Sequence, residues 1–186
     1  MNTVVTSREA ILKKSQEILL RDGYAALSIR AVAAACRVSV GSIYNYFDSK
    51  ADLLGATIEE IWGEIFHHSQ PPVILWDTQK YISWMYECLE YGNQRFPGFF
   101  AFHSLGFLGD EKLNGKKRMY QTWQHILSGL RHALEHDPKI RPNAFDSNFT
   151  PEKYARMIFS VFLSDTMMQK EYDPEIILEV IRRTLY

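Results

Sequence analysis

The chain has 186 residues, and its 21 lysines and arginines against 22 aspartates and glutamates give a formal net charge of −1. Apolar residues make up 46% of it and aromatic residues 13%, which excludes an intrinsically disordered protein because burial of this surface can offset chain entropy. The most apolar stretch, residues 96–108, is too short to cross a bilayer, and the N-terminus lacks the pattern of a secretory signal. With only two cysteines, Cys36 and Cys88, and no membrane span, we expect a reduced, cytoplasmic protein.

The charges are unevenly distributed along the chain. Residues 1–50 carry seven basic and four acidic side chains, a local balance of +3, whereas the remainder carries −4. This asymmetry is modest, but it favours an anionic partner for the N-terminal end.

Helix signals begin at the N-terminus. Thr6 and Glu9 have the spacing of a capping box, an apolar stripe follows, and Gly23 predicts the end of this first helix. Pro71 and Pro72 are expected to end the fourth helix. The second, third and fourth helices are expected to begin at Ser28, Ser39 and Ser49, respectively. Ser49 and Asp52 form a second capping pair.

The second half repeats this pattern with longer helices. Asp77 is expected to cap a helix that ends before Pro97, and residues 99–108, apolar on every side, predict a short buried helix. A helix over 116–135 follows. The last two helices are expected to open at Thr150–Pro151 and Asp173–Pro174, each a capping side chain followed by a proline. Since no longer stretch has the period of a strand, the sequence predicts an all-α protein of about nine helices.

Residues 27–54 are the most informative stretch, because two short helices are joined there by a tight turn near residues 36–39. This is the pattern of a helix-turn-helix, whose second helix enters the major groove of DNA. Ile43 and Phe47 are expected to hold the second helix to the core, while its hydroxyl and amide side chains suit phosphate oxygens and base edges. An ordinary helical hairpin is the alternative interpretation.

The same stretch resembles the DNA-binding domain of the TetR family of bacterial transcription regulators. The family pattern runs from a glycine-aromatic turn through an alanine-rich helix to Val-Ser-x-Gly-Ser, an aliphatic-Tyr-x-Tyr-Phe segment, and a closing Ser-Lys with a leucine pair. The positions that carry it are Gly23, Tyr24, residues 29–36, Val38, Ser39, Gly41, Ser42, Ile43, Tyr44, Tyr46, Phe47, Ser49, Lys50, Leu53 and Leu54. The likeness covers residues 6–66, and beyond them only the expected helix count agrees.

The resemblance implies two domains. Residues 1–50 would form a three-helix DNA-binding domain, a fourth helix would link it onward, and residues 67–186 would form a helical bundle that binds an effector and dimerises. The implied DNA-binding residues are Ser28, Arg30, Arg37, Ser39, Val40, Gly41, Ser42, Tyr44, Asn45, Tyr46 and Lys50.

Within this set the chemistry of the side chains suggests different roles. We expect Tyr44 and Lys50 to contact phosphates, and Asn45 and Tyr46, with help from Val40, to face bases.

Arg37 departs from the family pattern, because glycine usually stands at this end of the first motif helix. Glycine suits a left-handed C-terminal position, whereas an arginine there is strained. Either the turn closes differently, or Arg37 adopts the strained conformation and gains a phosphate contact. A solvated turn residue is an equally good interpretation.

Aromatic residues gather on the helices of the second half. Because such bulky rings do not interdigitate perfectly in a small bundle, we expect a cavity among them. The expected lining is Trp84, Cys88, Phe100, His103, Phe107, Tyr120 and Trp123. Its few polar atoms predict a flat or elongated hydrophobic effector with one or two polar groups.

The last two helices have more apolar positions than one inward stripe needs. These positions are Tyr154, Met157, Ile158, Val161, Phe162, Ile176, Ile177, Val180, Ile181 and Leu185. Paired across a two-fold axis they predict a four-helix dimer interface, which charge at Phe162 or Ile181 is expected to disrupt.

Histidines raise the question of a metal. His132 and His136 lie four apart on one expected helix face, yet Arg131 and Lys139 nearby oppose a cation, and no carboxylate completes a recognisable ligand set. We therefore expect no metal site and no cofactor.

These features predict a homodimeric repressor that binds double-stranded operator DNA of near-palindromic sequence and leaves it when a small-molecule effector binds. We find no nucleophile elbow, phosphate loop or zinc-helix motif in the sequence, so we expect no catalytic residues. Two alternatives stay open: a DNA-binding adaptor whose bundle recognises a protein, and a helical enzyme.

Overall fold

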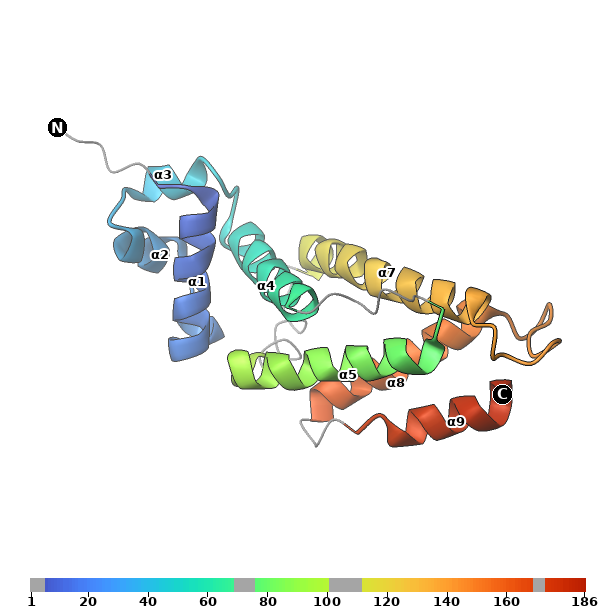
Figure 1. The fold of residues 1–186 in the computed structure, drawn as a ribbon. Helices are drawn as coiled ribbons and strands as arrows, with labels where there is room; N and C mark the ends of the chain where they lie inside the picture. The colour runs from blue at the N-terminus through green and yellow to red at the C-terminus, as the bar shows by residue number, and fades with distance from the viewer. Residues whose placement is uncertain (1–5, 69–75, 101–111, 169–172) are drawn as a thin grey trace. The chain divides into compact units, whose positions relative to one another are not determined.

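A computed structural model describes residues 6–68, 76–100, 112–168 and 173–186 of the chain. Within these ranges it contains eight α-helices, one short 3-10 helix and no strand, which confirms the all-α expectation (Figure 1). None of the helices in the described ranges is both long and apolar enough to span a membrane. The expected stop at Pro71 and Pro72, and residues 101–108 of the expected buried helix, lie outside the described residues.

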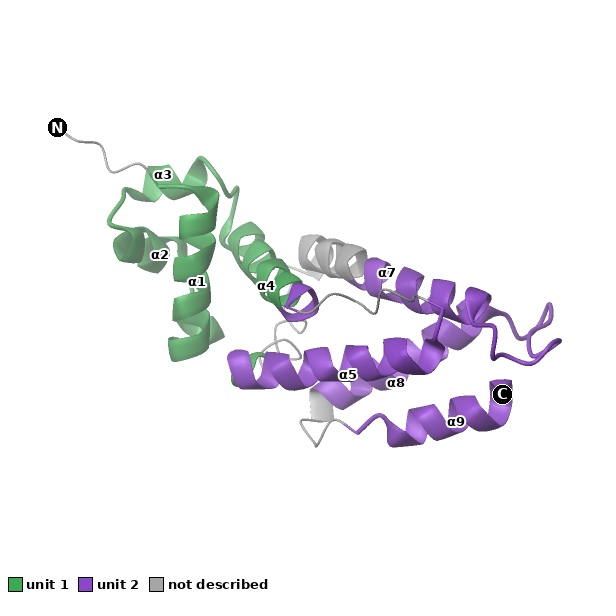
Figure 2. Ribbon diagram, in the orientation of Figure 1, with its two compact units in different colours: residues 1–64, 96–122 green, residues 65–95, 123–186 purple. Residues whose placement is uncertain are grey.

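Two compact units make up the fold (Figure 2). Unit 1 comprises residues 1–64 and 96–122, and unit 2 comprises residues 65–95 and 123–186. Each unit is therefore built from two separate segments of the chain, and α4 (Lys50–His67) carries the chain from the first unit into the second. The domain limits expected from the sequence remain a prediction.

Unit 1 begins with α1 (Arg8–Asp22), whose N-terminus is capped by Ser7. The Ser7 hydroxyl accepts a hydrogen bond from the backbone N–H of Ala10 at 3.2 Å, so the cap expected at Thr6 is wrong by one residue. The helix ends, as expected, at Gly23, whose φ of 82° is a left-handed value that glycine adopts without strain.

Short elements follow: the 3-10 helix η1 (Tyr24–Ala26), α2 (Ile29–Cys36) and α3 (Val40–Tyr44). Serines cap α2, α3 and α4 as expected, because each hydroxyl accepts a hydrogen bond from the backbone N–H three residues later: Ser28, Ser39 and Ser49. Asp52 completes the cap of α4, since its carboxylate accepts from the N–H of Asp48 at 3.1 Å.

The core of unit 1 draws apolar side chains from each of its helices. Members that are almost completely buried include Ile11, Leu12, Leu19, Val32, Ile43, Phe47, Leu53 and Ile61. Trp62 of α4 packs edge-on against Phe99, with ring centroids 5.6 Å apart. This contact joins α4 to the segment that re-enters the unit after residue 95.

Unit 2 contains α5 (Thr78–Arg95), α7 (Lys112–His136) from residue 123 onward, α8 (Pro151–Met168) and α9 (Glu175–Leu185). The caps expected for α5 and α8 are confirmed, because two side chains accept from the N–H three residues later: Asp77 and Thr150.

Helix α9 begins one residue later than expected. Pro174 occupies the N-cap position, and the carboxylate of Asp173 accepts from the N–H of Glu175 at 2.9 Å. The proline therefore precedes the first helical residue, while the aspartate still satisfies one N–H of the helix end.

A buried carboxylate, Asp137, joins three parts of unit 2. It accepts hydrogen bonds from the N–H of Thr78 at the start of α5, the hydroxyl of Tyr186 after α9, and the N–H of Lys139, at 2.9, 2.5 and 3.0 Å. Asp77 is also buried and accepts from the Lys139 ammonium at 2.9 Å. Burial alone would raise the pKa of Asp77, but the hydrogen bonds that it accepts outweigh burial and lower this pKa.

Candidate nucleic-acid interface and ligand cavity

The turn between α2 and α3 is closed by Arg37 in a left-handed conformation, with φ 58° and ψ 40°. Its N–H donates to the carbonyl of Ala34 at 3.1 Å, and the N–H of Val38 donates to the carbonyl of Ala33 at 3.0 Å. These two bonds are the Schellman arrangement that ends many helices, usually with glycine at the left-handed position. Of the two backbone alternatives left open by the sequence, the strained one is observed.

Helix α3 has a buried side and an exposed side. Ile43 is fully buried, and Phe47, just after the helix, is nearly so. On the other side Val40 and Tyr44 are 39% and 53% exposed, and Asn45, at the end of the helix, is exposed as well. A five-residue helix is not stable alone, so burial of two large side chains, at roughly 1.5–3 kcal/mol each, keeps its polar face outward.

The three serines in the expected DNA-binding set already have hydrogen bonds within the domain. Ser28 and Ser39 cap their helices, and the hydroxyl oxygens of Ser39 and Ser42 lie 2.9 Å apart. Gly41, between them, is exposed, and a side chain there would meet nothing closer than the Ser39 hydroxyl at 3.7 Å. The serine hydroxyls therefore stabilise the helix starts on both sides of the turn, and the glycine adds no side chain to the first turn of α3.

Tyr46 connects the end of the motif to the segment before α1. Its hydroxyl donates to the carbonyl of Thr6 at 2.7 Å, while the residue stays 41% exposed. Nothing in the local sequence indicates a bond between residues 40 positions apart. A side chain expected to face bases thus also has a structural role, and its contact with a base remains a prediction.

Two basic residues complete the expected set. Lys50 begins α4, and its ammonium lies 5.5 Å from the centre of the Tyr24 ring, a cation–π contact that restricts its position. Arg30 is exposed on α2. All of the expected DNA-binding residues belong to unit 1, and most are exposed.

A basic cavity of about 380 Å³ between α1 and the end of α2 was not expected from the sequence. Lys13, Lys14 and Arg37 line it, and the carboxylate of Glu17, also in its lining, pairs with Lys14 at 2.6 Å. The lysines are visible in the sequence, but their approach to Arg37 depends on the packing of two helices.

Unit 2 contains an open cavity of about 320 Å³ between the end of α4, α5 and α7. Three aromatic residues in its lining form a chain: Trp84 lies between Tyr81 and Phe66, with ring centroids 5.2 and 5.9 Å apart. The other lining residues are His67, His125, Ile126, Ser128, Gly129, Arg131 and His132. This combination of aromatic rings with a few polar and basic groups is typical of a small-molecule site.

Gly129 makes room in this cavity for Tyr81. A Cβ atom at position 129 would lie 2.2 Å from the Tyr81 hydroxyl oxygen, far inside van der Waals contact. The hydroxyl donates to the carbonyl of Ile126 at 3.1 Å, and burial raises the pKa of Tyr81, so the donor stays protonated. A glycine at 129 therefore lets the tyrosine reach the backbone of α7.

The lining expected from the sequence differs from this one. Among its described members Trp84 lines the cavity, whereas Cys88 is fully buried in the core, Phe100 belongs to unit 1, and Trp123 packs on α8. The remaining three, His103, Phe107 and the side chain of Tyr120, lie outside the described residues. The expected lining was chosen from the aromatic and apolar residues of these helices, whereas much of the observed lining consists of small and polar residues of α7.

A signal for this lining does exist in the sequence. His125, Ser128, Gly129 and His132 recur at the spacing of one helix face, next to the apolar stripe that contains Leu130.

The apolar set expected to form a dimer interface divides into two groups. Its buried members serve the core of the protomer itself: Tyr154, Ile158, Phe162, Ile177, Ile181 and Leu185. Its exposed members, between 39% and 69% exposed, are Met157, Val161, Ile176 and Val180. Phe162 and Ile181, the two positions named for an added charge, are buried within the protomer, so charge there would disrupt the core of unit 2 as well.

Comparisons with known proteins agree with this geometry. The sequence pattern of the bacterial regulatory proteins of the tetR family matches residues 11–57, which include α2 and α3. The HTH-type transcriptional repressor DhaR of Mycobacterium sp. (strain GP1) is 29% identical over 58 residues, which are 31% of this chain and 29% of that protein. The chain thus matches less than a third of the length of this curated relative.

Two solved structures are similar over nearly the whole chain. The transcriptional regulator FadR from Bacillus subtilis, in complex with stearoyl-CoA, has a TM-score of 0.71 at 14% identity and covers 97% of this chain and 100% of its own. BioQ with its double-stranded DNA operator has a TM-score of 0.65 at 18% identity, with 96% and 97% covered. At these identities the likeness shows a shared fold.

The Schellman turn, the buried side of α3 and its exposed polar side define a helix-turn-helix DNA-binding domain. Residues 11–57 match the tetR family of bacterial regulatory proteins, so this domain is of the tetR type.

The left-handed turn predicts the effect of Arg37→Gly. The change should raise the free energy of unfolding by up to about 1 kcal/mol, because glycine adopts this conformation without the steric cost that arginine has. Chemical denaturation measures this effect. Arg37→Ala is the control, since it removes the guanidinium but retains the strain. Weaker DNA binding in both variants would assign a phosphate contact to Arg37, and a less stable Arg37→Gly protein would contradict the strain.

Proposed function

We propose that the protein is a homodimeric transcription repressor that binds a near-palindromic operator through α3 and leaves it when a small-molecule effector binds. The observation that carries this proposal is the exposed polar face of α3 in a TetR-type helix-turn-helix. The repressor DhaR and the operator complex of BioQ, both similar to this chain, support it.

In the proposed complex, side chains of α3, of the residue that follows it and of the start of α4 make different kinds of contact with DNA. Tyr44 and Lys50 contact phosphates, which orient the domain without reading sequence. Asn45 presents an amide to a base edge, and Val40 offers apolar contact of the kind that a thymine methyl accepts. The open start of α3 at Gly41 permits close approach of the helix to the groove.

The proposed dimer interface is the exposed apolar surface of α8 and α9. Met157 and Val161 lie one turn apart on α8, as do Ile176 and Val180 on α9. The Tyr154 and Thr184 hydroxyls, 2.7 Å apart, tie the two helices together within the protomer. Two such helix pairs, related by a two-fold axis, would bury these four side chains in a four-helix interface.

The proposed effector site is the cavity of unit 2. Its aromatic chain suits a flat hydrophobic molecule, and its histidines and Arg131 suit one acidic or polar group on that molecule. The stearoyl-CoA complex of FadR, a similar fold, supports ligand binding by this class of protein. Phe66 and His67 line the cavity and end the same helix that Lys50 begins, so α4 provides a route from effector to DNA.

The DNA contacts are tested with the duplex of highest affinity selected by the wild-type protein from a random pool. Lys50→Ala should weaken binding to all sequences alike and reduce the salt slope by about one, because it removes one phosphate contact. Asn45→Ala should relax preference at one base pair at a cost of roughly 1–3 kcal/mol. Fluorescence anisotropy over a salt series measures both effects.

The control Lys80→Ala changes a lysine in the first turn of α5, outside the matched domain, and should leave binding unchanged. Unaltered affinity and selectivity in both test variants would refute the assignment.

The interface is tested by placing charge on its exposed side chains. Val161→Glu and Val180→Glu should each give monomers, because a carboxylate buried at a two-fold axis faces its own copy. Light scattering after size-exclusion chromatography measures the mass. Gln94→Glu, which adds the same charge to an exposed position of α5, should remain dimeric. If the Val161→Glu and Val180→Glu variants both remained dimeric, this surface would be ruled out as the dimer interface.

The effector cavity is tested with 8-anilinonaphthalene-1-sulfonate, a flat hydrophobic anion. The probe should quench tryptophan fluorescence and release the selected duplex over the same concentration range, because the two equilibria are linked. Gly129→Ala should weaken both responses, since its methyl group displaces Tyr81. Gly63→Ala is the matched control, because a Cβ there meets nothing within 4 Å. Equal effects of the two substitutions, or probe binding without DNA release, would contradict this site.

A further inference from the structure

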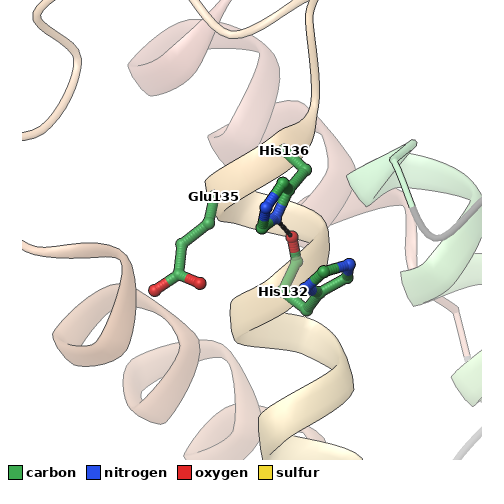
Figure 3. Close-up of side chains that lie close together, drawn as sticks. All are labelled: His132, Glu135 and His136. Carbon is green, nitrogen blue, oxygen red and sulfur yellow. Dashed lines mark hydrogen bonds between the residues drawn. The ribbon is translucent and has the colours of Figure 1, made fainter.

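Three side chains at the C-terminal end of α7 form a cluster, of which the proposed function uses only His132, as part of the cavity lining (Figure 3). One nitrogen from each ring of His132 and His136 and one carboxylate oxygen of Glu135 lie within 4.8 Å of one another. The two rings are neighbours across one helical turn, with centroids 4.0 Å apart. The proximity of the Glu135 carboxylate to the two histidines was not expected from the sequence.

We propose that His132, Glu135 and His136 bind one divalent transition-metal ion of the Zn²⁺ class, with water completing the coordination. Imidazole and carboxylate are common ligands of Zn²⁺ and Ni²⁺, and three protein ligands plus water satisfy a tetrahedral ion. Bonds of about 2.0–2.1 Å place the ligands of a tetrahedral zinc ion about 3.3 Å apart. The observed spread of 4.8 Å must therefore shrink by about 1.5 Å, which rotation of the exposed Glu135 side chain and small tilts of the two rings allow.

Two features favour a cation at this place. The Nδ1 atom of His136 lies 2.9 Å from the carbonyl oxygen of His132, a bond that holds the proton on Nδ1 and leaves the lone pair of Nε2 for a metal (Figure 3). His136 is also the last residue of α7, where the negative end of the helix dipole attracts positive charge.

The basic residues nearby do not block the cluster. The Lys139 ammonium is bound to Asp77 at 2.9 Å, so its charge is directed to another carboxylate. Arg131 approaches Glu135 at 3.6 Å, but both side chains are exposed, and surface ion pairs of this kind are weak. A metal ion would compete with Arg131 for the Glu135 carboxylate. His132 also lines the cavity of unit 2, so the ion would lie at the edge of that cavity.

The test is a titration of the full chain with Zn²⁺ in competition with a chromophoric chelator. One ion should bind per protomer. His136→Ala should weaken binding at least about tenfold, because loss of even an outer-shell partner commonly has this effect. Glu135→Gln should weaken it by a smaller factor, whereas Arg131→Gln should tighten it by removing the competing cation.

A matched control separates this cluster from histidines in general. His68 directly follows the end of α4, as His136 stands at the end of α7. Its Nδ1 lies 2.7 Å from the carbonyl oxygen of Ile65, so His68→Ala removes a similar imidazole from another site. Circular dichroism verifies that each variant is folded. Unchanged affinity in His136→Ala, an equal loss in His68→Ala, or less than one ion bound per protomer would overturn the proposal.

Discussion

Because α3 has only five residues, its position depends on the burial of Ile43 and Phe47 and on the left-handed turn at Arg37. The first interaction fixes which side of the helix faces the core, and the second fixes the direction in which the chain enters it. Serine caps at the starts of α2 and α3 each then satisfy one of the N–H groups that a helix start leaves unpaired. The exposed polar side follows from these constraints, since no other orientation buries both large residues.

Unit 2 contains an open cavity, and a few long-range polar contacts hold its helices in place. The carboxylate of Asp137 joins the start of α5 to the residues beyond α7 and to Tyr186 beyond α9 through hydrogen bonds of 2.5 to 3.0 Å. Tyr81 is anchored separately, by its bond to the backbone of α7 next to Gly129.

Local features of the fold could be predicted from the sequence, because they depend on neighbouring residues. The caps at Ser28, Ser39, Ser49, Asp77 and Thr150 and the stop at Gly23 all follow from side chains within a few positions of each helix end. At Arg37 the sequence showed only that a left-handed turn would be strained, and left open whether the turn forms. The exposed side of α3 follows from helical periodicity in the same way.

Features that join distant segments could not be predicted. The bond from Tyr46 to Thr6, the basic cavity at Lys13 and the placement of Phe100 in unit 1 depend on which helices pack together. The choice between buried and exposed residues on α8 has the same origin. Phe162 and Val161 are both apolar, and only the packing of a neighbouring helix decides that one belongs to the core.

The length of α4 has a mechanical consequence. Its 18 residues make a rod about 27 Å long, with Lys50 at one end and two residues of the cavity lining at the other. A rod of this length that pivots about one end by about 5° displaces the opposite end by about 2.4 Å. Hydrogen bonds to a base edge tolerate only a few tenths of an ångström, roughly the width of their normal range. In the proposed repressor, leverage of this kind would make a small rotation at the cavity end of α4 large at its DNA-binding end, and the response would depend on the stiffness of this one helix.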